Sequence, residues 1–521
     1  MQKPPENKQK PLLRISNLKQ YFPLKTKGLY VKANDGITLD IFEGETLGLV
    51  GESGCGKSTF GRTILQLYKQ TDGRTMYYGR TLDELAPEYA EKTIKDLDKN
   101  KKKLAELEQK RDALEKVYEE LPDGKEKYQK RNELDSIRKQ VNDLFLDLAN
   151  ILGGFILAED TKPVINAFSN AYRTSARLCA EKYRLEEVQL DLADAKYSLE
   201  KARKAGKSGL SEESRVRKAQ TKTAEIQTRI ENIRKDLEQA RMVIENMRKS
   251  YQNDPEFQRL EGFRDDGIDL ARLNYNEIRL LRSDLQMIFQ DPYSSLNPRM
   301  TVGQIISEGL FAHNYFKKND ERMQEYIFKV MEDAGLQPYF IHRYPHQFSG
   351  GQRQRIGIAR SLAVRPRFVV CDEAVSALDV SIQSQILNLL QDLKEQQHLT
   401  YLFITHDMSV VKYISDRIGV MYLGNIVELA DSQEIFAHPL HPYTEALMNA
   451  IPTTDIMSGK EMQILEGDIP SPVNPPDGCK FHTRCKYCTE ICRHQIPEWR
   501  EAAPNHFAAC HHLLERQETS L

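Results

Sequence analysis

The chain has 521 residues, of which 40% are hydrophobic, and a formal net charge of −2 at pH 7. This length predicts about two to four structural parts, and the near-neutral charge excludes a general attraction to nucleic acid or to an acidic membrane. There is no apolar run of about 18 residues that could span a bilayer, and MQKPPENKQK at the start is no apolar signal segment. We therefore expect a cytosolic chain whose eight cysteines form no structural disulfides.

The first predicted α/β region covers residues 13–79 and contains a phosphate-binding motif. ETLGLVGESGCGKST has the pattern of a short apolar strand, a glycine-rich turn and a helix start. Gly51–Ser58 fits G-x-x-x-x-G-K-[ST], in which backbone N–H groups wrap the phosphates, Lys57 reaches the β- and γ-phosphates and the Ser58 hydroxyl ligates Mg²⁺. We interpret Cys55 as a small packing residue rather than a redox switch. The predicted nucleotide contacts here are Gly51, Glu52, Ser53, Gly54, Cys55, Gly56, Lys57, Ser58 and Thr59.

Residues 80–262 differ in character, because they are rich in Lys, Glu, Leu and Gln and their apolar residues follow a heptad spacing. One such set, with alternating steps of three and four, is Ile226, Ile230, Ile233, Leu237, Ala240, Ile244 and Met247. The spacing predicts about four antiparallel coiled-coil helices, the longest roughly forty residues and about 60 Å long. Breaks are expected at Pro122–Gly124, Gly153–Gly154 and Gly206–Gly209, and Ser211 suits a helix N-cap. A self-packed insertion without a ligand is favoured over a docking arm for a partner.

The α/β pattern returns at residues 263–450, where polar side chains follow apolar runs. Asp372 and Glu373 follow one predicted strand, His406 follows another, and Gln290 follows the run MIF. One carboxylate suits Mg²⁺, and its neighbour can orient or deprotonate a water. A histidine can hydrogen-bond a γ-phosphate, and a neutral amide can contact both a water and Mg²⁺. Each of these residues alone is commonplace, but together with Lys57 they predict ATP hydrolysis. Ser58, Gln290 and Asp372 are the predicted Mg²⁺ ligands.

A second glycine-rich stretch, FSGGQRQR, begins at Phe348 and opens a predicted helix. Such a helix start can hold an anion on its backbone N–H groups. With the motifs above, it makes the chain resemble the nucleotide-binding subunit of an ATP-binding cassette (ABC) transporter. The resemblance implies a P-loop α/β cassette, and it covers residues 13–79 and 263–450. It makes Gly51–Ser58 the Walker A motif, Gln290 the Q-loop, Ser349, Gly350, Gly351 and Gln352 the signature, Asp372 and Glu373 Walker B with its catalytic glutamate, Asp379 the D-loop residue and His406 the switch histidine.

In this family two cassettes pair head to tail, so the resemblance implies that the signature of one chain closes over the ATP held by the Walker A motif of the other. The stretches IFQDPYSSLNPRMTVG, CDEAVSALDVSIQSQILNLL and EGDIPSPVNPPDGCKFHTRC are similar to the oligopeptide/dipeptide importer branch, in particular to the second ATPase subunit of an oligopeptide permease. That similarity implies a peripheral protein on the cytoplasmic face of the membrane. Its implied partners are a related second ATPase, two permease subunits and, indirectly, a peptide-binding lipoprotein, with no nucleic acid. It also implies adenine stacking on Tyr21 or Phe22, and the choice between them stays open.

The expected domains are a discontinuous cassette at residues 1–79 and 263–438, an all-α insertion at 80–262 and a small extension at 439–521. Two residues depart from the family pattern, namely Ala374 after the glutamate and Phe348 in the signature. Asp372 and Glu373 are unchanged. The alternative is a chromosome-maintenance or repair ATPase with a coiled-coil arm. Its coils are typically longer and lie after the Q-loop, whereas this insertion precedes Gln290. A ribosome-associated cassette protein would normally carry two cassettes.

Five of the eight cysteines crowd into residues 479–510, and four of them are separated by five, six and seventeen residues. This spacing is not that of a zinc ribbon. In the importer branch the positions that match Cys479, Cys485, Cys492 and Cys510 are associated with a [4Fe–4S] cluster, whereas Cys488 is usually replaced. Four thiolates suit either iron–sulphur or zinc, and His482, His506 and His511 are alternative zinc ligands. The cluster is favoured, with a structural role.

Overall fold

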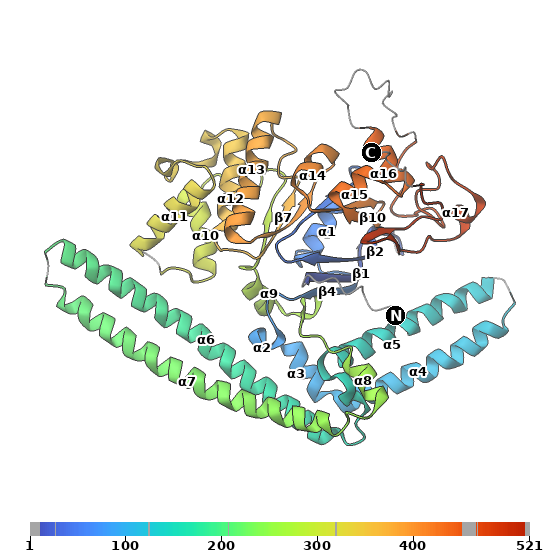
Figure 1. Cartoon of the computed structure of the whole chain (residues 1–521), viewed down its shortest axis with the longest axis horizontal. Helices are drawn as coiled ribbons and strands as arrows, with labels where there is room; N and C mark the ends of the chain where they lie inside the picture. The colour runs from blue at the N-terminus through green and yellow to red at the C-terminus, as the bar shows by residue number, and fades with distance from the viewer. Residues whose placement is uncertain are drawn as a thin grey trace. The chain divides into compact units, whose positions relative to one another are not determined.

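The computed structural model describes residues 11–26, 28–122, 125–206, 208–317, 320–450, 465 and 467–515. The chain divides into two compact units (Figure 1). The first comprises residues 1–79, 269–271 and 278–521, and the second comprises residues 80–268 and 272–277. No helix in the described ranges is long and apolar enough to cross a bilayer.

The first unit is built on two sheets. The smaller has the strand order β2-β1-β4-β5, with β1 antiparallel to both β2 and β4. The larger has the order β11-β12-β10-β9-β3-β8-β7-β6, in which β9, β3, β8, β7 and β6 run parallel. The strands are β1 (Pro11–Pro23), β2 (Tyr30–Phe42), β3 (Thr46–Val50), β4 (Asp72–Tyr77), β5 (Ile268–Asp269), β6 (Leu285–Ile288), β7 (Phe368–Asp372), β8 (Thr400–Ile404), β9 (Arg417–Tyr422), β10 (Asn425–Asp431), β11 (Arg500–Ala503) and β12 (His506–Ala508).

The central parallel strands explain why short apolar runs predicted them correctly. Every residue of β3, β7 and β8 is buried, because helices pack on both faces of such a sheet and leave no polar face. The predicted α/β cassette is therefore confirmed. The helices of this unit are α1 (Lys57–Ile64), α10 (Val302–Ala312), α11 (Glu321–Asp333), α12 (Gly350–Leu362), α13 (Val380–Gln397), α14 (Met408–Ile414), α15 (Ser432–Ala437), α16 (Pro442–Asn449) and α17 (Glu490–His494), and α9 (Tyr275–Leu281) begins at its boundary.

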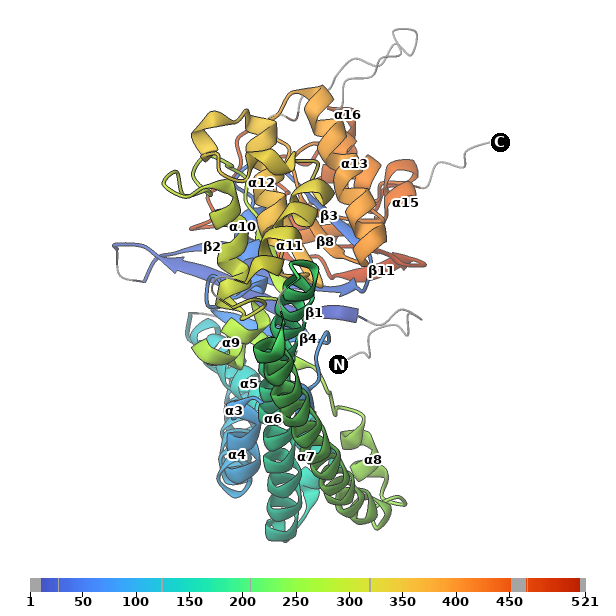
Figure 2. The ribbon, with the colours of Figure 1, turned by 90° about the vertical axis from the view of Figure 1, so that its left-hand side faces the viewer.

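The second unit is helical. Its long helices form two hairpins, one of α4 and α5 and one of α6 and α7, and Figure 2 shows α6 and α7 running side by side. A shared base of buried apolar residues, among them the fully buried Phe155, Phe257 and Leu148, joins these elements. Its helices are α2 (Leu82–Leu85), α3 (Glu88–Lys95), α4 (Leu97–Glu120), α5 (Lys125–Leu152), α6 (Thr161–Lys204), α7 (Leu210–Lys249) and α8 (Pro255–Glu261).

The predicted apolar seam of α7 is buried against α6, since Ile226, Ile230, Ile233 and Leu237 form one cluster with Leu178. The prediction that Ser211 is the N-cap is wrong. Gly209 caps α7 in a left-handed conformation with φ of 59°, and the helix begins at Leu210. Glu212 and Glu213 lie in the first turn, where they favour the helix dipole. Of the expected break at Pro122–Gly124, residues 123 and 124 lie outside the described part of the chain.

Candidate nucleotide site

The loop between β3 and α1 depends on glycine. Gly51, Gly54 and Gly56 have φ values of 152°, 80° and 106°, which side-chain-bearing residues rarely adopt. A Cβ on Gly51 would lie 2.1 Å from the backbone oxygen of Met421, and one on Gly56 would lie 2.1 Å from that of Ala33. The backbone of the loop is therefore packed against neighbouring strands as closely as its atoms allow.

Lys57 is the first residue of α1, and its side chain turns back into the loop. Its Nζ donates to the backbone oxygens of Gly51 at 2.7 Å and Glu52 at 3.0 Å. Although it is charged, the residue is only 4% exposed, so the loop carbonyls take the place of water around the ammonium group. This arrangement presents a desolvated positive charge within the glycine-rich loop.

Ser58 links the loop to the end of β7. Its hydroxyl donates to Oδ1 of Asp372 at 2.5 Å, and Arg62 lies 3.4 Å from the other carboxylate oxygen. Burial raises the pKa of the Asp372 carboxyl, while the Ser58 hydrogen bond and the Arg62 charge oppose that rise. A hydroxyl and a carboxylate oxygen side by side are the hard ligands that Mg²⁺ takes.

Glu373 is contacted by two of the other predicted catalytic side chains, Gln290 and His406. Nε2 of Gln290 donates to one of its carboxylate oxygens at 2.6 Å, and Nδ1 of His406 lies 3.5 Å from the other. Glu373 has a positive φ of 47°, and its N–H donates to the oxygen of Ile404 on the neighbouring strand. Three side chains separated by up to 116 positions (290 to 406) therefore converge on one point.

The signature residues start α12. Ser349 is its N-cap, and its hydroxyl and the side chain of Gln352 form a capping box. Gly351 lies against α13, where a Cβ would approach Ile382 to 2.6 Å. Asp379 is the exposed N-cap of α13. Within the described ranges no hydrogen bond or ion pair joins Ser349–Gln352 to the Gly51–Thr59 loop.

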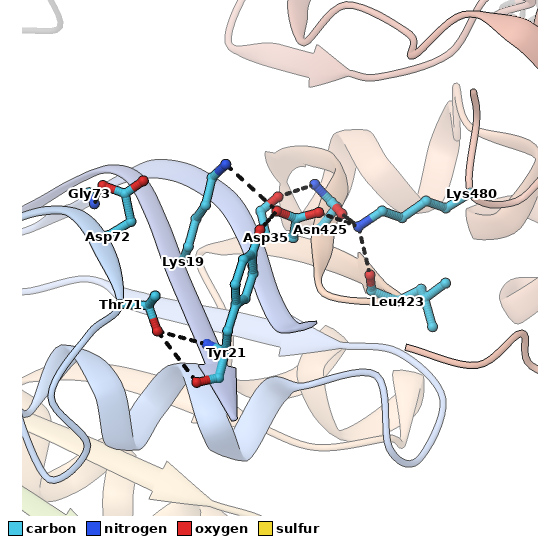
Figure 3. Close-up of polar contacts among 9 residues, drawn as sticks. All are labelled: Lys19, Tyr21, Asp35, Thr71, Asp72, Gly73, Leu423, Asn425 and Lys480. Carbon is cyan, nitrogen blue, oxygen red and sulfur yellow. Dashed lines mark hydrogen bonds and ion pairs between the residues drawn. The ribbon is translucent and has the colours of Figure 1, made fainter. Parts of the chain in front are cut away.

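The two aromatic candidates for adenine stacking lie next to each other on β1 but have different contacts. The Tyr21 hydroxyl donates to Asp35, which also accepts from Nζ of Lys480 at 3.1 Å (Figure 3). Phe22 packs edge-on against Tyr68, with ring centroids 5.3 Å apart. Tyr21 is therefore held through its hydroxyl, whereas Phe22 is held by packing.

The C-terminal cysteines lie close together. Cys479, Cys485, Cys492 and Cys510 line one small cavity, together with His482 and His511, and Cys488 does not line it. Burial raises the pKa of Cys479 to about 11. No group of three or more His, Cys, Asp or Glu residues is spaced to hold a metal ion among the described residues.

Sequence reasoning missed the polar residues that hold this site in place. Arg484 forms a two-pronged ion pair with Glu52, at 2.7 and 3.0 Å. The Tyr443 hydroxyl accepts from the N–H of Glu52 at 2.9 Å. All of these contacts join positions that are hundreds of residues apart, so the local pattern carried no signal for them.

The fold and the site define a P-loop ATPase of the ABC class. The family model described as "ABC transporter" matches residues 34–251 and 258–376, and the model described as "Oligopeptide/dipeptide transporter, C-terminal region" matches residues 427–492. Oligopeptide transport ATP-binding protein AppF of Bacillus subtilis is 52% identical over 250 residues, which are 47% of this chain and 75% of the relative. For OppF of Salmonella typhimurium the identity is 51% over 246 residues, 47% of this chain and 73% of the relative.

The chain belongs to the family of ABC transporter ATP-binding proteins, and within it to the oligopeptide/dipeptide importer type. It is the ATPase subunit of a peptide import transporter. The predicted family and function are confirmed, and the alternative of a chromosome-maintenance or repair ATPase is set aside.

Proposed function

We propose that the Gly51–Thr59 loop binds the phosphates of ATP and that Glu373 activates the attacking water. The convergence of Gln290 and His406 on Glu373, one residue from Asp372, carries this proposal. Lys57 and His406 hold the γ-phosphate. Ser58, Asp372 and Gln290 would hold Mg²⁺, which would neutralise charge on the phosphates of ATP.

Glu373→Gln tests this assignment. The amide keeps the shape of the carboxylate but cannot accept the proton of the water, so ATP binds while turnover falls by about 10²–10⁴. Turnover is measured in the assembled transporter with the partner ATPase carrying the same disabling change. Near-normal hydrolysis in that assembly would rule out Glu373 as the catalytic base.

The remaining parts of the site act in a pair of cassettes. In this proposal Ser349–Gln352 of one chain closes over the ATP of a related second ATPase subunit, and Asp379 lies at the same interface. The N-terminus of α12 favours an anion, and among the described residues Ser349 makes no hydrogen bond to the phosphate loop. The pair sits on two permease subunits at the cytoplasmic face of the membrane and serves a peptide-binding lipoprotein. Either Tyr21 or Phe22 stacks on adenine.

The domain proposal is a cassette formed by residues 1–79 and 263–438, a helical insertion at 80–262 and an extension at 439–521. The separate compact unit at residues 80–268 supports the independence of the insertion. Its buried seams support a self-packed antiparallel coiled coil.

The extension is proposed to hold a [4Fe–4S] cluster on Cys479, Cys485, Cys492 and Cys510, with zinc as the alternative. Four thiols around one cavity have the donor chemistry for either group, and the group would cross-link the extension. Anaerobic purification with iron, sulphide and zinc assays and a visible spectrum distinguishes them. Stoichiometric zinc without acid-labile sulphide would exclude the cluster. Cys492→Ser is expected to lose the bound group and Cys488→Ser to keep it.

A further inference from the structure

One turn of the C-terminal extension, residues 479–485, contacts the nucleotide site through two cations. Arg484 reaches Glu52 in the phosphate loop, and Lys480 reaches Asp35 on β2. Both cations lie in the stretch EGDIPSPVNPPDGCKFHTRC, which is similar to the importer branch, but neither has a role in the proposed chemistry.

The contact between Arg484 and Glu52 is buried and bidentate. The Arg484 side chain is 4% exposed, and it donates two separate N–H groups to the two carboxylate oxygens of Glu52. A planar fork of this kind fixes orientation as well as distance. The guanidinium group also lies 6.0 Å from the ring centre of Tyr422 on β9.

Glu52 is thereby held at every polar group. Its N–H donates to the Tyr443 hydroxyl, its carboxylate accepts from Arg484, and its backbone oxygen accepts from Nζ of Lys57. The position of Lys57 therefore depends on that of Glu52. A shift of Glu52 would move the ammonium group that meets the phosphates.

The second cation acts on the strands beside the loop. Nζ of Lys480 donates to Asp35 at 3.1 Å and to the backbone oxygen of Leu423 at 3.2 Å, and it also contacts Asn425 (Figure 3). Asp35 accepts the hydroxyl of Tyr21. Because Cys479 and Cys485 bracket the turn, whatever fixes these two thiols also fixes both cations.

We propose that Arg484 is a positioning residue for ATP binding, which holds Glu52 so that the phosphate loop presents Lys57 to the nucleotide. The C-terminal extension thereby sets the affinity for ATP. This inference rests on the proposed role of the Gly51–Thr59 loop.

The test compares Arg484→Gln, Glu52→Gln and the double variant in the assembled transporter. Small misplacements of contact atoms have large effects, of order 10²-fold for about 1 Å, so each single variant is expected to raise the KM for ATP by about tenfold or more. The kcat is expected to fall less than the KM rises, because Arg484 and Glu52 do not touch the reacting atoms and act on them only through Lys57. The double variant is expected to be no worse than the singles, and Arg484→Lys to restore part of the affinity.

Arg493→Gln is the matched control, since it removes a cation of the same extension whose side chain is 60% exposed. Melting temperature and metal content are measured for every variant. An unchanged KM in Arg484→Gln, or additive losses in the double variant, would overturn the inference. If Arg484→Gln does not fold, Glu52→Gln decides alone, because it leaves the extension intact and an unchanged KM rejects the role.

Lys57→Ala tests the phosphate loop separately. Retained ATP binding in that variant would reject the proposed nucleotide site rather than the role of Arg484.

Discussion

Cys55 shows how a single residue in the phosphate loop is kept unreactive. It is 2% exposed, and burial raises the pKa of its thiol although Nζ of Lys57 lies 3.7 Å away. Cys371 on β7 is fully buried, and burial raises the pKa of its thiol strongly. Since the thiolate is the nucleophile, neither cysteine has the ionised, accessible form that reacts.

We therefore expect Cys55 and Cys371 to stay unmodified when the native protein is treated with iodoacetamide near neutral pH. The half-buried Cys488, outside the cysteine-lined cavity, is the internal comparison and should be labelled first. Peptide mass spectrometry at several times measures the labelling of each cysteine, and protein unfolded in guanidinium defines complete reaction. Labelling of Cys55 as fast as that of Cys488 would show that the loop opens readily.

At the same scale, the sequence predicted residues that follow apolar strands. Asp372, Glu373 and His406 could be found because the carboxyl ends of parallel strands form binding edges. The contacts of Arg484 and Lys480 could not be found, because their partners are 432 and 445 positions away and no local pattern points to them. The positive φ of Glu373 also had no sequence signal, since a residue with a side chain rarely adopts that conformation.

Among the elements, helices with long periodic seams were predictable and short polar strands were not. β11 reads REAA and has no alternating apolar pattern. β12 joins the sheet through a buried pair, in which His506 lies 2.7 Å from a carboxylate oxygen of Glu428 and both side chains are fully buried. That pairing is set by tertiary contacts, which a local pattern does not record.

The α6/α7 hairpin offers a matched pair of substitutions. Ile233 is 7% exposed within the seam, whereas Met242 on the same helix is 62% exposed. Ile233→Ala should destabilise the hairpin by about 2–5 kcal/mol, because it leaves a cavity, and Met242→Ala should cost little. Hydrogen exchange of the α6 and α7 amides measures both. Equal protection in the two variants would mean that the seam contributes little to the hairpin.

On the scale of the whole molecule, the helical unit interrupts the cassette between β4 and β5, which neighbour each other in the small sheet. Replacing residues 80–262 with a short Gly/Ser linker should therefore leave ATP binding unchanged, since the predicted site residues all lie in the other unit. Binding of a fluorescent ATP analogue is the measurement, with Lys57→Ala in the shortened chain as the negative control. A shortened chain that folds but binds no ATP would contradict the independence of the insertion. Loss of peptide uptake alone would mean that the insertion has a partner.

The position of β3 has a consequence for how the protein is made. Its two neighbours in the sheet are β8 and β9, and the first of these begins 350 positions after Val50. At about 5–20 residues per second, the ribosome needs roughly 18–70 s to supply that partner. The hairpins α4/α5 and α6/α7 each pair helices that are adjacent in the chain. Contacts of this kind form fast, so both hairpins can form while the edges of β3 are unpaired and its apolar side chains are exposed. The nascent chain can therefore contain a folded helical unit while the sheet is still incomplete. In that state β3 is exposed to chaperones before the nucleotide site has formed.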